Sequence, residues 1–536
     1  MKMNILLTAL GVIAQISLTF AVVPPTDSLN RAPENWYNLD PETNQVQGVS
    51  TEKTYEILAN RKGEKIVVAV IDSGVDIDHE DLRDNVWVNA DEIAGNGKDD
   101  DQNGYVDDVY GWNFIGGADG SHVNYDTYEL TREYATLKKK YEGVNLEELP
   151  KKEREYFQEI EQKFTQKAAE AEQEFQAFTY FHKNYSRSAK LLEAYLDVDS
   201  LTIADVDRLE SSDEIVLMAK SFLEYAMENG LDGSMLEEGI EHYQQAVEYG
   251  YNLEYNPRTI VGDHYEDVSE RYYGNSDVTG PDSRHGTHVA GIIAANRNNN
   301  LGIKGIADHV EIMAIRAVPN GDERDKDVAN AIYYAVDNGA NIINMSFGKS
   351  FSPHKEVVDE AVRYAEEKGV LIIHAAGNSS ENIDETDNFP SRQYQGNKKF
   401  ANNWIEVGAS SWKGEGEFVA NFSNYGKHSV DVFAPGVDVF STTPNQGYES
   451  LSGTSMAAPV TAGVAALLMS YYPDLTAAQV KEIILTSAVK LDDLKVNCPG
   501  KEGKQVNFSS LSSTGGVVNA FEAVKIAESY QIQKEK

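Results

Sequence analysis

The sequence places a carboxylate, an imidazole and a hydroxyl in three short stretches that lie far apart in the chain. Asp72 stands in VIDSGVD, His285 in HGTHVAG and Ser455 in GTSMAAP. A serine hydroxyl becomes a good nucleophile when a neighbouring base accepts its proton. A histidine can be that base, and a carboxylate can hold its tautomer and stabilise the imidazolium that forms. These three side chains could therefore carry out acyl transfer if the fold brings them together.

Asn378, which ends the stretch AAGN, is a fourth candidate. Its amide could donate a hydrogen bond to the oxyanion of a tetrahedral intermediate, together with the backbone N–H of Ser455. Ser455 opens a run of small residues that predicts a helix, and a serine there can also be a simple N-cap. His285 and His288 could be metal ligands, but no third ligand follows them closely in the sequence. We expect His285 to be the base and His288 to lie in the core.

The candidates stand near the ends of predicted strands. Apolar runs rich in β-branched residues are typical of strands buried on both faces of a parallel sheet, and here they alternate with helical segments. These runs cover residues 66–71, 310–318, 340–348, 369–378, 404–410 and 430–436. The alternation predicts an α/β fold with a doubly wound, mostly parallel sheet. Sites in such sheets form at the carboxyl ends of the strands, where Asp72, Ser346 and Asn378 stand.

The totals exclude some classes of protein. The chain has 536 residues and a net charge of −39, which argues against a nucleic-acid-binding protein. Residues 1–21 read as a signal peptide cut after Ala21, so we expect export to the periplasm or beyond the cell. An uncleaved anchor is the alternative, although the apolar run is short for a membrane span. The single cysteine, Cys498, excludes an intramolecular disulfide, and bound metal could provide stability instead.

The middle of the chain differs from the rest. Residues 22–64 form a polar N-terminal extension, and the sheet pattern then occupies residues 66–118 and 281–530. Between them, residues 119–280 carry apolar positions three and four apart, which is typical of helices. We therefore predict an inserted all-α subdomain, either a small bundle or a long hairpin.

The four stretches that hold Asp72, His285, Asn378 and Ser455 resemble, in content and order, those of the subtilisin-like serine proteases (subtilases). The resemblance covers the two sheet segments but not the insertion. It implies a serine endopeptidase that acts on proteins or peptides through an acyl-enzyme and uses no organic cofactor. It also implies that Asp72, His285 and Ser455 form the catalytic triad. Asn378 would be the oxyanion donor.

The same resemblance implies a groove for an extended peptide. Residues expected to line the groove and its first specificity pocket are Ser346, Phe347, Gly348, Ala376, Gly377 and Asn388. The last of these opens NFP, 388–390, a stretch that often holds a cis proline in the family. The acidic run GDERDKD, 321–327, falls where the outer subsites form. We expect it to be a solvated loop, with a preference for basic substrate residues as the alternative.

The stretch GNGKDDDQNGYVDD predicts a calcium loop. Asp99, Asp101 and Asn103 alternate, and Asp107 takes the ninth place, which follows the oxygen-rich spacing of such loops. The twelfth place holds Tyr110 in place of a bidentate glutamate, so the loop is a variant. The alternative is a cluster of Asp and Asn turns that binds no metal.

A second calcium site is implied by the resemblance alone. Asp81 and Asn299 match side-chain ligands of the family's high-affinity site. The backbone carbonyls of Arg297, Leu301 and Ile303 would complete it. In a chain without disulfides, calcium would stabilise these loops.

The gap between the candidate carboxylate and imidazole is the main departure from the family. We expect the insertion that fills it to act as a lid or as a docking surface for a partner. The 22–64 extension is short for a folded propeptide. Two other functions stay open: an adaptor whose protease part is latent, and a serine hydrolase that acts on non-peptide esters. The intact candidate residues argue against the first, and the peptide groove argues against the second.

Overall fold

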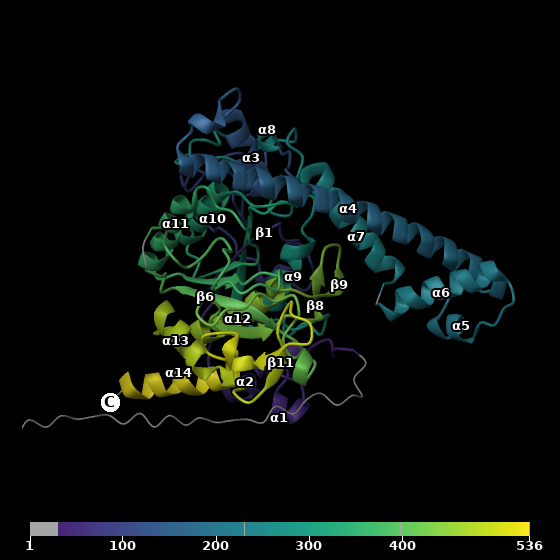
Figure 1. Ribbon diagram of the computed structural model, residues 1–536. Coiled ribbons are helices and arrows are strands. Elements are labelled where there is room, and N and C mark those ends of the chain that lie inside the picture. The colour runs from purple at the N-terminus through teal and green to yellow at the C-terminus, as the bar shows by residue number, and fades with distance from the viewer. Residues whose placement is uncertain (1–30, 230, 397–398, 535–536) are drawn as a thin grey trace, which may run out of the picture.

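The computed structural model describes residues 31–229, 231–396 and 399–534, so the predicted signal peptide, 1–21, lies outside the described residues. A nine-stranded sheet forms the centre of the molecule (Figure 1). Its strands lie in the order β10 (Val489–Lys490), β13 (Gly516–Val517), β7 (Val432–Pro435), β6 (Trp404–Ser410), β5 (Leu371–Ala375), β4 (Ile342–Met345), β1 (Ile66–Asp72), β3 (Val310–Arg316) and β2 (Gly111–Asn113). Neighbouring strands are parallel except β10 and β13, so the predicted α/β class with a mostly parallel sheet is confirmed.

Helices and two small antiparallel strand pairs complete the described chain. The helices outside the insertion are α1 (Pro41–Asn44), α2 (Thr51–Leu58), α9 (Arg284–Ala294), α10 (Asp325–Asp337), α11 (Lys355–Lys368), α12 (Thr454–Tyr471), α13 (Ala477–Ser487) and α14 (Ala520–Lys534). The strand pairs are β8 (Val439–Thr443) with β9 (Gly447–Leu451) and β11 (Lys495–Asn497) with β12 (Gln505–Asn507). Helices therefore alternate with strands along the chain, as the sequence pattern predicts.

Alternation along β1 explains why helices cover both faces of the sheet. Val68 and Val70 belong to one apolar cluster, which includes residues of α9 and α12. Ala69 and Ile71 belong to a second cluster, which includes residues of α10 and α11. Successive side chains in a strand point to opposite faces, so a continuous apolar run needs a helical layer on each side.

Each predicted strand run contains a strand, and several runs reach beyond it, including the two that hold candidate site residues. The run 340–348 holds β4, and the run 369–378 holds β5. The residues that follow, Ser346 to Gly348 and Ala376 to Asn378, form loops at the carboxyl ends of these strands. Their position agrees with the rule that sites in parallel sheets form at these ends.

Helix α12 is the central helix of the domain. Among the described residues it is the one helix long and apolar enough to cross a membrane, but 94% of its apolar window is buried inside the protein. Small residues let it approach its neighbours: a Cβ at Gly463 would lie 2.4 Å from the Ile306 side chain. Its apolar composition therefore reflects a place in the core of the domain.

The described part of the N-terminal extension packs against the domain. Trp36 and Tyr37 are fully buried in the cluster that holds α9 and α12. The Trp36 indole N–H donates to the carbonyls of Val437 and Asp438, both at 3.2 Å. This segment, although polar in composition, contributes two large aromatic side chains to the core.

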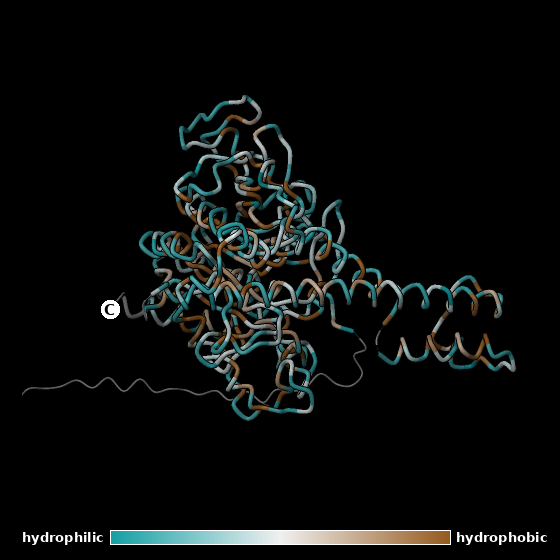
Figure 2. The backbone as a smooth tube through the Cα atoms, turned by 45° about the horizontal axis from the view of Figure 1, so that its top comes forward, coloured by the Kyte–Doolittle hydropathy of each residue, from teal (hydrophilic) through white to brown (hydrophobic). Residues whose placement is uncertain are grey.

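The insertion is helical, as predicted, and forms a long hairpin. Its helices are α3 (Glu129–Lys140), α4 (Lys151–Leu196), α5 (Ile203–Arg208), α6 (Glu214–Glu228), α7 (Gly233–Gln245) and α8 (Arg258–Val261). Helix α4 has 46 residues and projects away from the sheet, with α5, α6 and α7 beside it (Figure 1). Figure 2 shows the same projection in a second view, with polar and apolar residues mixed along the helices. We call this projection the arm.

The insertion has two apolar clusters of its own. One joins α3 to the near end of α4 and holds Leu130, Phe157 and Ile160. The other joins the far end of α4 to α5 and α6 and holds Leu192 and Leu223 among others. The far end of the arm is thus stabilised independently of the sheet domain.

The last part of the predicted insertion packs on the sheet domain. The Trp112 indole N–H donates to the carbonyl of Tyr273 at 2.7 Å, and Asn113 and Asn275 form an antiparallel bridge. The segment therefore returns beside β2 well before residue 281.

Most of the acidic run 321–327 is buried, so the expectation of a solvated loop is wrong. Lys326 and Asp327 are fully buried, and Glu323 is 2% exposed. The base of the insertion covers them: Arg258 pairs with Asp327 at 2.6 Å, and the Lys326 amine lies 2.7 Å from a carboxylate oxygen of Asp263. Lys326 and Asp327 are therefore balanced by residues that follow the arm in the sequence.

The same network reaches the loop after β4. The Lys349 amine lies 2.7 Å from a Glu129 oxygen and 2.9 Å from an Asp325 oxygen, and all three side chains are buried. Arg324 pairs with Asp126 at 2.7 Å. Removing one partner of a buried ion pair typically costs about 3–5 kcal/mol, so this network fixes the insertion firmly to the sheet domain.

Candidate functional site

The carboxylate and the imidazole predicted to work together meet at the end of β1. His285 Nδ1 lies 2.7 Å from Asp72 Oδ1, although the residues are 213 positions apart. The same oxygen accepts the backbone N–H of Ser73 at 2.7 Å. The other oxygen, Oδ2, is buried and has no hydrogen-bond partner among the described residues. An imidazolium on His285 would therefore be the cation nearest to this carboxylate.

Glycine allows this close approach. A Cβ at Gly286 would lie 2.1 Å from the carbonyl oxygen of Gly74 and 3.1 Å from Asp72 Cβ. Gly74 itself has φ +129°, a conformation that side chains disfavour. Gly74 in VIDSGVD and Gly286 in HGTHVAG thus have a steric role in joining β1 to α9.

His285 and Asp72 form an electrostatic pair. Burial lowers the pKa of His285, but the charge of Asp72 and its hydrogen bond raise it, and the net pKa lies above the ordinary value of 6.5. Asp282 also raises this pKa, whereas Arg284 lowers it. The His285 side chain is 38% exposed, so it can reach both solvent and a bound substrate.

His288 has the core position expected for it. It is fully buried, its Nε2 lies 3.2 Å from the carbonyl oxygen of Glu449, and burial lowers its pKa to about 3. It is therefore neutral, and it faces a different partner from His285.

Ser455 stands in the first turn of α12, which packs against α9. Its hydroxyl donates to the carbonyl oxygen of Ser346 at 3.0 Å. The Ser346 hydroxyl in turn donates to the carbonyl oxygen of Ser455 at 3.0 Å. Because a hydroxyl has one proton, Ser455 must turn away from Ser346 before it can donate to His285.

Asn378 is oriented by Thr454, a residue whose role the sequence reasoning missed. Asn378 Oδ1 accepts from both the backbone N–H and the hydroxyl of Thr454, each at 2.9 Å. The amide nitrogen therefore points away from Thr454. A Cβ at Gly453 would lie 3.4 Å from this nitrogen and 3.5 Å from the backbone nitrogen of Ser455. The glycine thus leaves open a position flanked by the two predicted oxyanion donors.

The predicted groove residues come together at the ends of β4 and β5. A Cβ at Gly348 would lie 3.0 Å from Asn388 Oδ1, and the Asn388 amide donates to the carbonyl of Ala376 at 3.1 Å. Gly377 faces the same asparagine, since a Cβ there would lie 3.6 Å from Asn388 Oδ1. The expected cis peptide bond before Pro390 is present.

Asn424 is a further residue that the sequence reasoning missed. Its amide nitrogen donates to the carbonyl of Ala376 at 2.9 Å, and its oxygen accepts the backbone N–H groups of Ser379 and Glu381. It holds the loop on either side of Asn378 in place. No local pattern marks this asparagine, because its partners lie about forty-five residues earlier.

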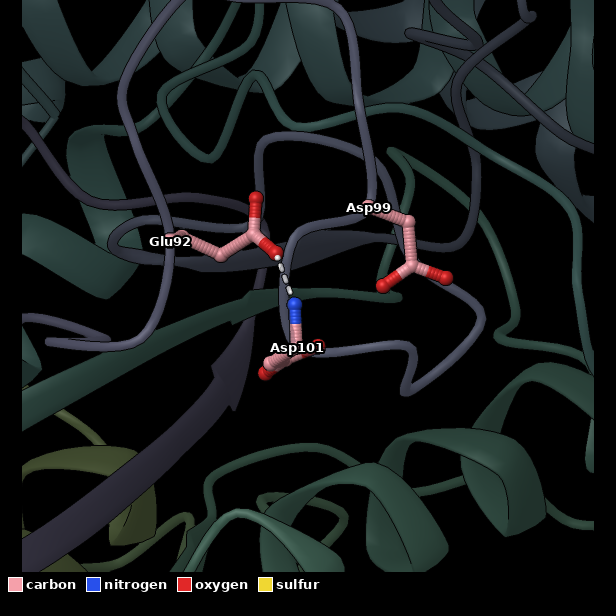
Figure 3. A group of neighbouring side chains, drawn as sticks. All are labelled: Glu92, Asp99 and Asp101. Atoms are coloured by element: carbon pink, nitrogen blue, oxygen red, sulfur yellow. Dashed lines mark hydrogen bonds between the residues drawn. The ribbon is translucent and has the colours of Figure 1, made fainter.

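The predicted calcium loop brings together part of its expected ligand set. Carboxylate oxygens of Asp99, Asp101 and Glu92 lie within 4.8 Å of one another (Figure 3). Asp107 instead accepts the backbone N–H groups of Asn96 and Gly97. Glu92 lies before the motif, so the spacing of the motif could not reveal it.

Asn103 has its side chain turned into the loop. Its Oδ1 accepts the backbone N–H of Tyr105, and its amide nitrogen donates to Asp101 and Asp108, each at 3.0 Å. This arrangement directs its nitrogen, not its oxygen, toward the carboxylates. Asn103 thus lies beside the carboxylate group, and its role as a metal ligand stays a prediction.

The donor set of Glu92, Asp99 and Asp101 fits a hard cation. Glu92 is 8% exposed, and its Oε2 has no hydrogen-bond partner within the described part of the chain. Burial, with the charges of Asp101 and Glu92, raises the pKa of neighbouring Asp108 to about 6. Closely spaced carboxylates that repel one another are stabilised by Ca²⁺, which prefers such oxygens.

The second expected calcium site is arranged differently. Asp81 is fully buried and accepts the Asn299 amide at 2.7 Å and the Ile303 backbone N–H at 3.1 Å. The Tyr448 hydroxyl donates to the same carboxylate at 3.3 Å. The structure thus brings Asp81 and Asn299 together, and their role as calcium ligands stays a prediction.

Comparison with known proteins places the whole arrangement in a family. The model of the subtilase family matches residues 63–504. A thermophilic serine proteinase of Bacillus sp. (strain AK1) is 34% identical over 328 residues, which cover 54% of this chain and 75% of that protein. Subtilisin DY of Bacillus licheniformis is 35% identical over 268 residues, 49% of this chain and 87% of that protein.

Thermitase of Thermoactinomyces vulgaris is 38% identical over 219 residues, 40% of this chain and 72% of that protein. These relatives, the family match and the sheet topology agree with the resemblance carried by the four short motifs. The chain belongs to the subtilase family of serine endopeptidases.

Proposed function

We propose that Asp72, His285 and Ser455 form the catalytic triad of this endopeptidase and that Asn378 is its oxyanion donor. The observation that carries the proposal is the 2.7 Å contact between His285 Nδ1 and Asp72. It fixes the tautomer of the imidazole and leaves Nε2 free to act as a base.

In the acylation step, the Ser455 hydroxyl turns from Ser346 to His285 Nε2. Its oxygen attacks the substrate carbonyl carbon while Nε2 accepts the proton, and Asp72 stabilises the imidazolium. The negative charge on the substrate oxygen is met by Asn378 Nδ2 and the backbone N–H of Ser455. The tetrahedral intermediate then collapses, the peptide C–N bond breaks, and the imidazolium gives its proton to the leaving amine.

Deacylation repeats these steps with water. His285 accepts a proton from the water as its oxygen attacks the acyl carbon, and the imidazolium returns the proton to the departing oxygen of Ser455. The products are a new carboxylate, the released amine of the first step and the free enzyme.

The groove favours peptides over simple esters as substrates. When Ser455 turns away, the carbonyl oxygen of Ser346 loses its hydrogen bond and becomes available to a substrate N–H. An extended peptide can pair with backbone groups in this way along residues 346–348. An ester without backbone N–H groups gains nothing from such a strand edge.

We further propose export of the enzyme through the signal peptide, residues 1–21, with action in the periplasm or outside the cell. A positively charged start, a short apolar run and a small residue at the cut site support this proposal. The large negative charge would keep such a protein soluble.

A calcium ion is proposed at the loop that holds Asp99 and Asp101, with Glu92 as a third carboxylate ligand. The support is the 4.8 Å grouping and the buried, unpartnered oxygen of Glu92. The ion would balance the three charges and hold the loop next to β2.

The arm is proposed to be a docking surface for polypeptides rather than a lid. It projects away from the sheet domain in both views (Figures 1 and 2). On α6, Ile215, Met218 and Tyr225 are 64%, 73% and 54% exposed, and their spacing puts them on one face. Residues 209–250 are rich in carboxylates and hold one lysine, Lys220, and no arginine. The surface therefore suits a basic polypeptide with apolar side chains.

Labelling with a fluorophosphonate probe tests the triad. We expect the probe to react with the mature protein and Ser455→Ala to abolish labelling, because the reactive oxygen is lost. Ser452→Ala, a nearby serine outside the triad, should label normally. Equal labelling of the wild type and Ser455→Ala would exclude Ser455 as the nucleophile.

The pH dependence of kcat/KM tests the role of His285. The neutral imidazole is the active form and its pKa is raised, so activity should fall as the pH drops through a midpoint above 6.5. Asp282→Asn should move this midpoint to lower pH, and Arg284→Gln should move it to higher pH, with similar plateau rates. Shifts in the same direction would contradict the electrostatic account.

Thermal unfolding of the Ser455→Ala protein with and without calcium tests the metal proposal. Calcium at about 100 times its Kd should add about 2.7 kcal/mol to the free energy of unfolding. Glu92→Gln should reduce this gain strongly, whereas Asp107→Asn, outside the carboxylate group, should reduce it little. The reverse ranking would show that the ligand set is wrong.

Deletion of the far arm tests the docking proposal. Tyr185 lies 3.5 Å from the place of a Gly233 Cβ, so a short Gly/Ser turn can replace residues 186–232. We expect unchanged cleavage of short peptides and an at least about tenfold lower kcat/KM for reduced, alkylated lysozyme, a basic unfolded polypeptide. Ile215→Ser/Met218→Ser should give part of the same loss. Faster cleavage of the polypeptide would instead identify the arm as a lid.

A further inference from the structure

A second histidine–carboxylate pair lies behind the substrate groove, away from the triad. His374 on β5 and Glu406 on β6 are register partners in adjacent parallel strands. His374 Nδ1 lies 2.9 Å from Glu406 Oε1. The His374 side chain is 0% exposed and that of Glu406 is 6% exposed, so the pair is shielded from water.

The other ring nitrogen faces the loop segment 346–348, which follows β4. His374 Nε2 lies 2.9 Å from the carbonyl oxygen of Phe347, which can only accept a hydrogen bond. Glu406 also acts as an acceptor, because its Oε2 receives the indole N–H of Trp404 at 2.7 Å. Both neighbours of the imidazole are therefore acceptors.

The two ring nitrogens of His374 thus have different partners. The carbonyl oxygen of Phe347 can only accept, so His374 Nε2 carries the proton of that hydrogen bond. The carboxyl group of Glu406 holds the ring from its other nitrogen, Nδ1.

Phe347 is the middle residue of the proposed substrate-binding segment, residues 346–348. The Ser346 carbonyl faces Ser455, whereas the Phe347 carbonyl faces His374. Because the two carbonyls face different partners, the Phe347 carbonyl can be fixed without blocking the Ser346 carbonyl. Of the side chains that the structure describes, His374 is the one that donates a hydrogen bond to the Phe347 carbonyl.

We propose that His374, held by Glu406, is a positioning residue that fixes the substrate-binding segment 346–348 from behind. It touches neither the substrate nor the reacting atoms. Its hydrogen bond holds the Phe347 carbonyl inward, and this keeps the backbone groups of Ser346 and Gly348 directed toward an extended peptide. The inference rests on the proposed function of these residues as a peptide groove.

A fair test must change both members of the pair, His374 and Glu406, in the same variant. His374→Leu alone would leave the buried carboxylate of Glu406 without its imidazole partner and could prevent folding. The test variant is therefore His374→Leu/Glu406→Gln. His374→Gln is the conservative variant, because its side-chain amide can still donate to the Phe347 carbonyl. Both proteins are compared with the wild type after their thermal unfolding midpoints have been measured.

The measurement is kcat and KM for two peptides that share the cleaved bond. One peptide has a single residue before that bond. The other has four residues there and can pair with the backbone of residues 346–348. For the long peptide, we expect the double variant to raise KM about threefold to tenfold, which corresponds to one hydrogen bond. The values for the short peptide should stay the same, and His374→Gln should restore most of the loss.

The rate of fluorophosphonate labelling separates the possible failures. Normal labelling with an unchanged ratio of long-peptide to short-peptide kcat/KM in the double variant would overturn the positioning role, even if the midpoint of unfolding falls. If the double variant does not fold, His374→Gln decides: a ratio below one-third of the wild-type value would overturn the proposal. Absence of labelling in the wild type would instead refute the proposed triad.

Discussion

The rest of the structure depends on one junction, where the chain that leaves β1 meets the chain that enters α9. The backbone N–H of Val75 donates to the Val278 carbonyl at 3.0 Å, and that of Asp76 donates to the Thr287 hydroxyl at 2.8 Å. With these contacts made, the imidazole of His285 is held against its carboxylate. The entropic cost of closing a loop grows only slowly with its length, so the junction tolerates a very long insertion.

The insertion has two parts that are stabilised in different ways: a base fixed to the sheet domain and a projecting arm. At the base, charged side chains from both sides of the arm, such as Glu129 and Arg258, are buried in ion pairs with Lys349 and Asp327. Lys349 directly follows the proposed substrate-binding segment, residues 346–348, so the base supports one end of the proposed groove. Farther out, the arm has its own apolar cluster and needs no contact with the sheet. These differences explain how a helical hairpin can be added without disturbing the pairing of His285 with Asp72.

Motif residues were predictable because each motif combines a local shape with a chemical group, as at Asp72 and Ser455. The sheet was predictable from apolar runs that must be buried on both faces. Glu92 and Asn424 were not, because their roles depend on partners supplied by distant loops. The burial of 321–327 was missed for a related reason: a charged run looks solvated until the residues that neutralise it are known. The pairing of His374 with a carboxylate on the next strand likewise appears only in three dimensions.

The most direct test of the account is a crystal structure of the enzyme after reaction with a peptide fluorophosphonate. We expect the phosphorus to be bonded to Ser455 Oγ and its oxygen to lie within hydrogen-bond distance of Asn378 Nδ2 and the backbone nitrogen of Ser455. The Ser346 carbonyl, freed from the serine hydroxyl, should accept an N–H of the peptide. Attachment to another residue, or a phosphoryl oxygen that points to solvent away from Asn378, would contradict the account.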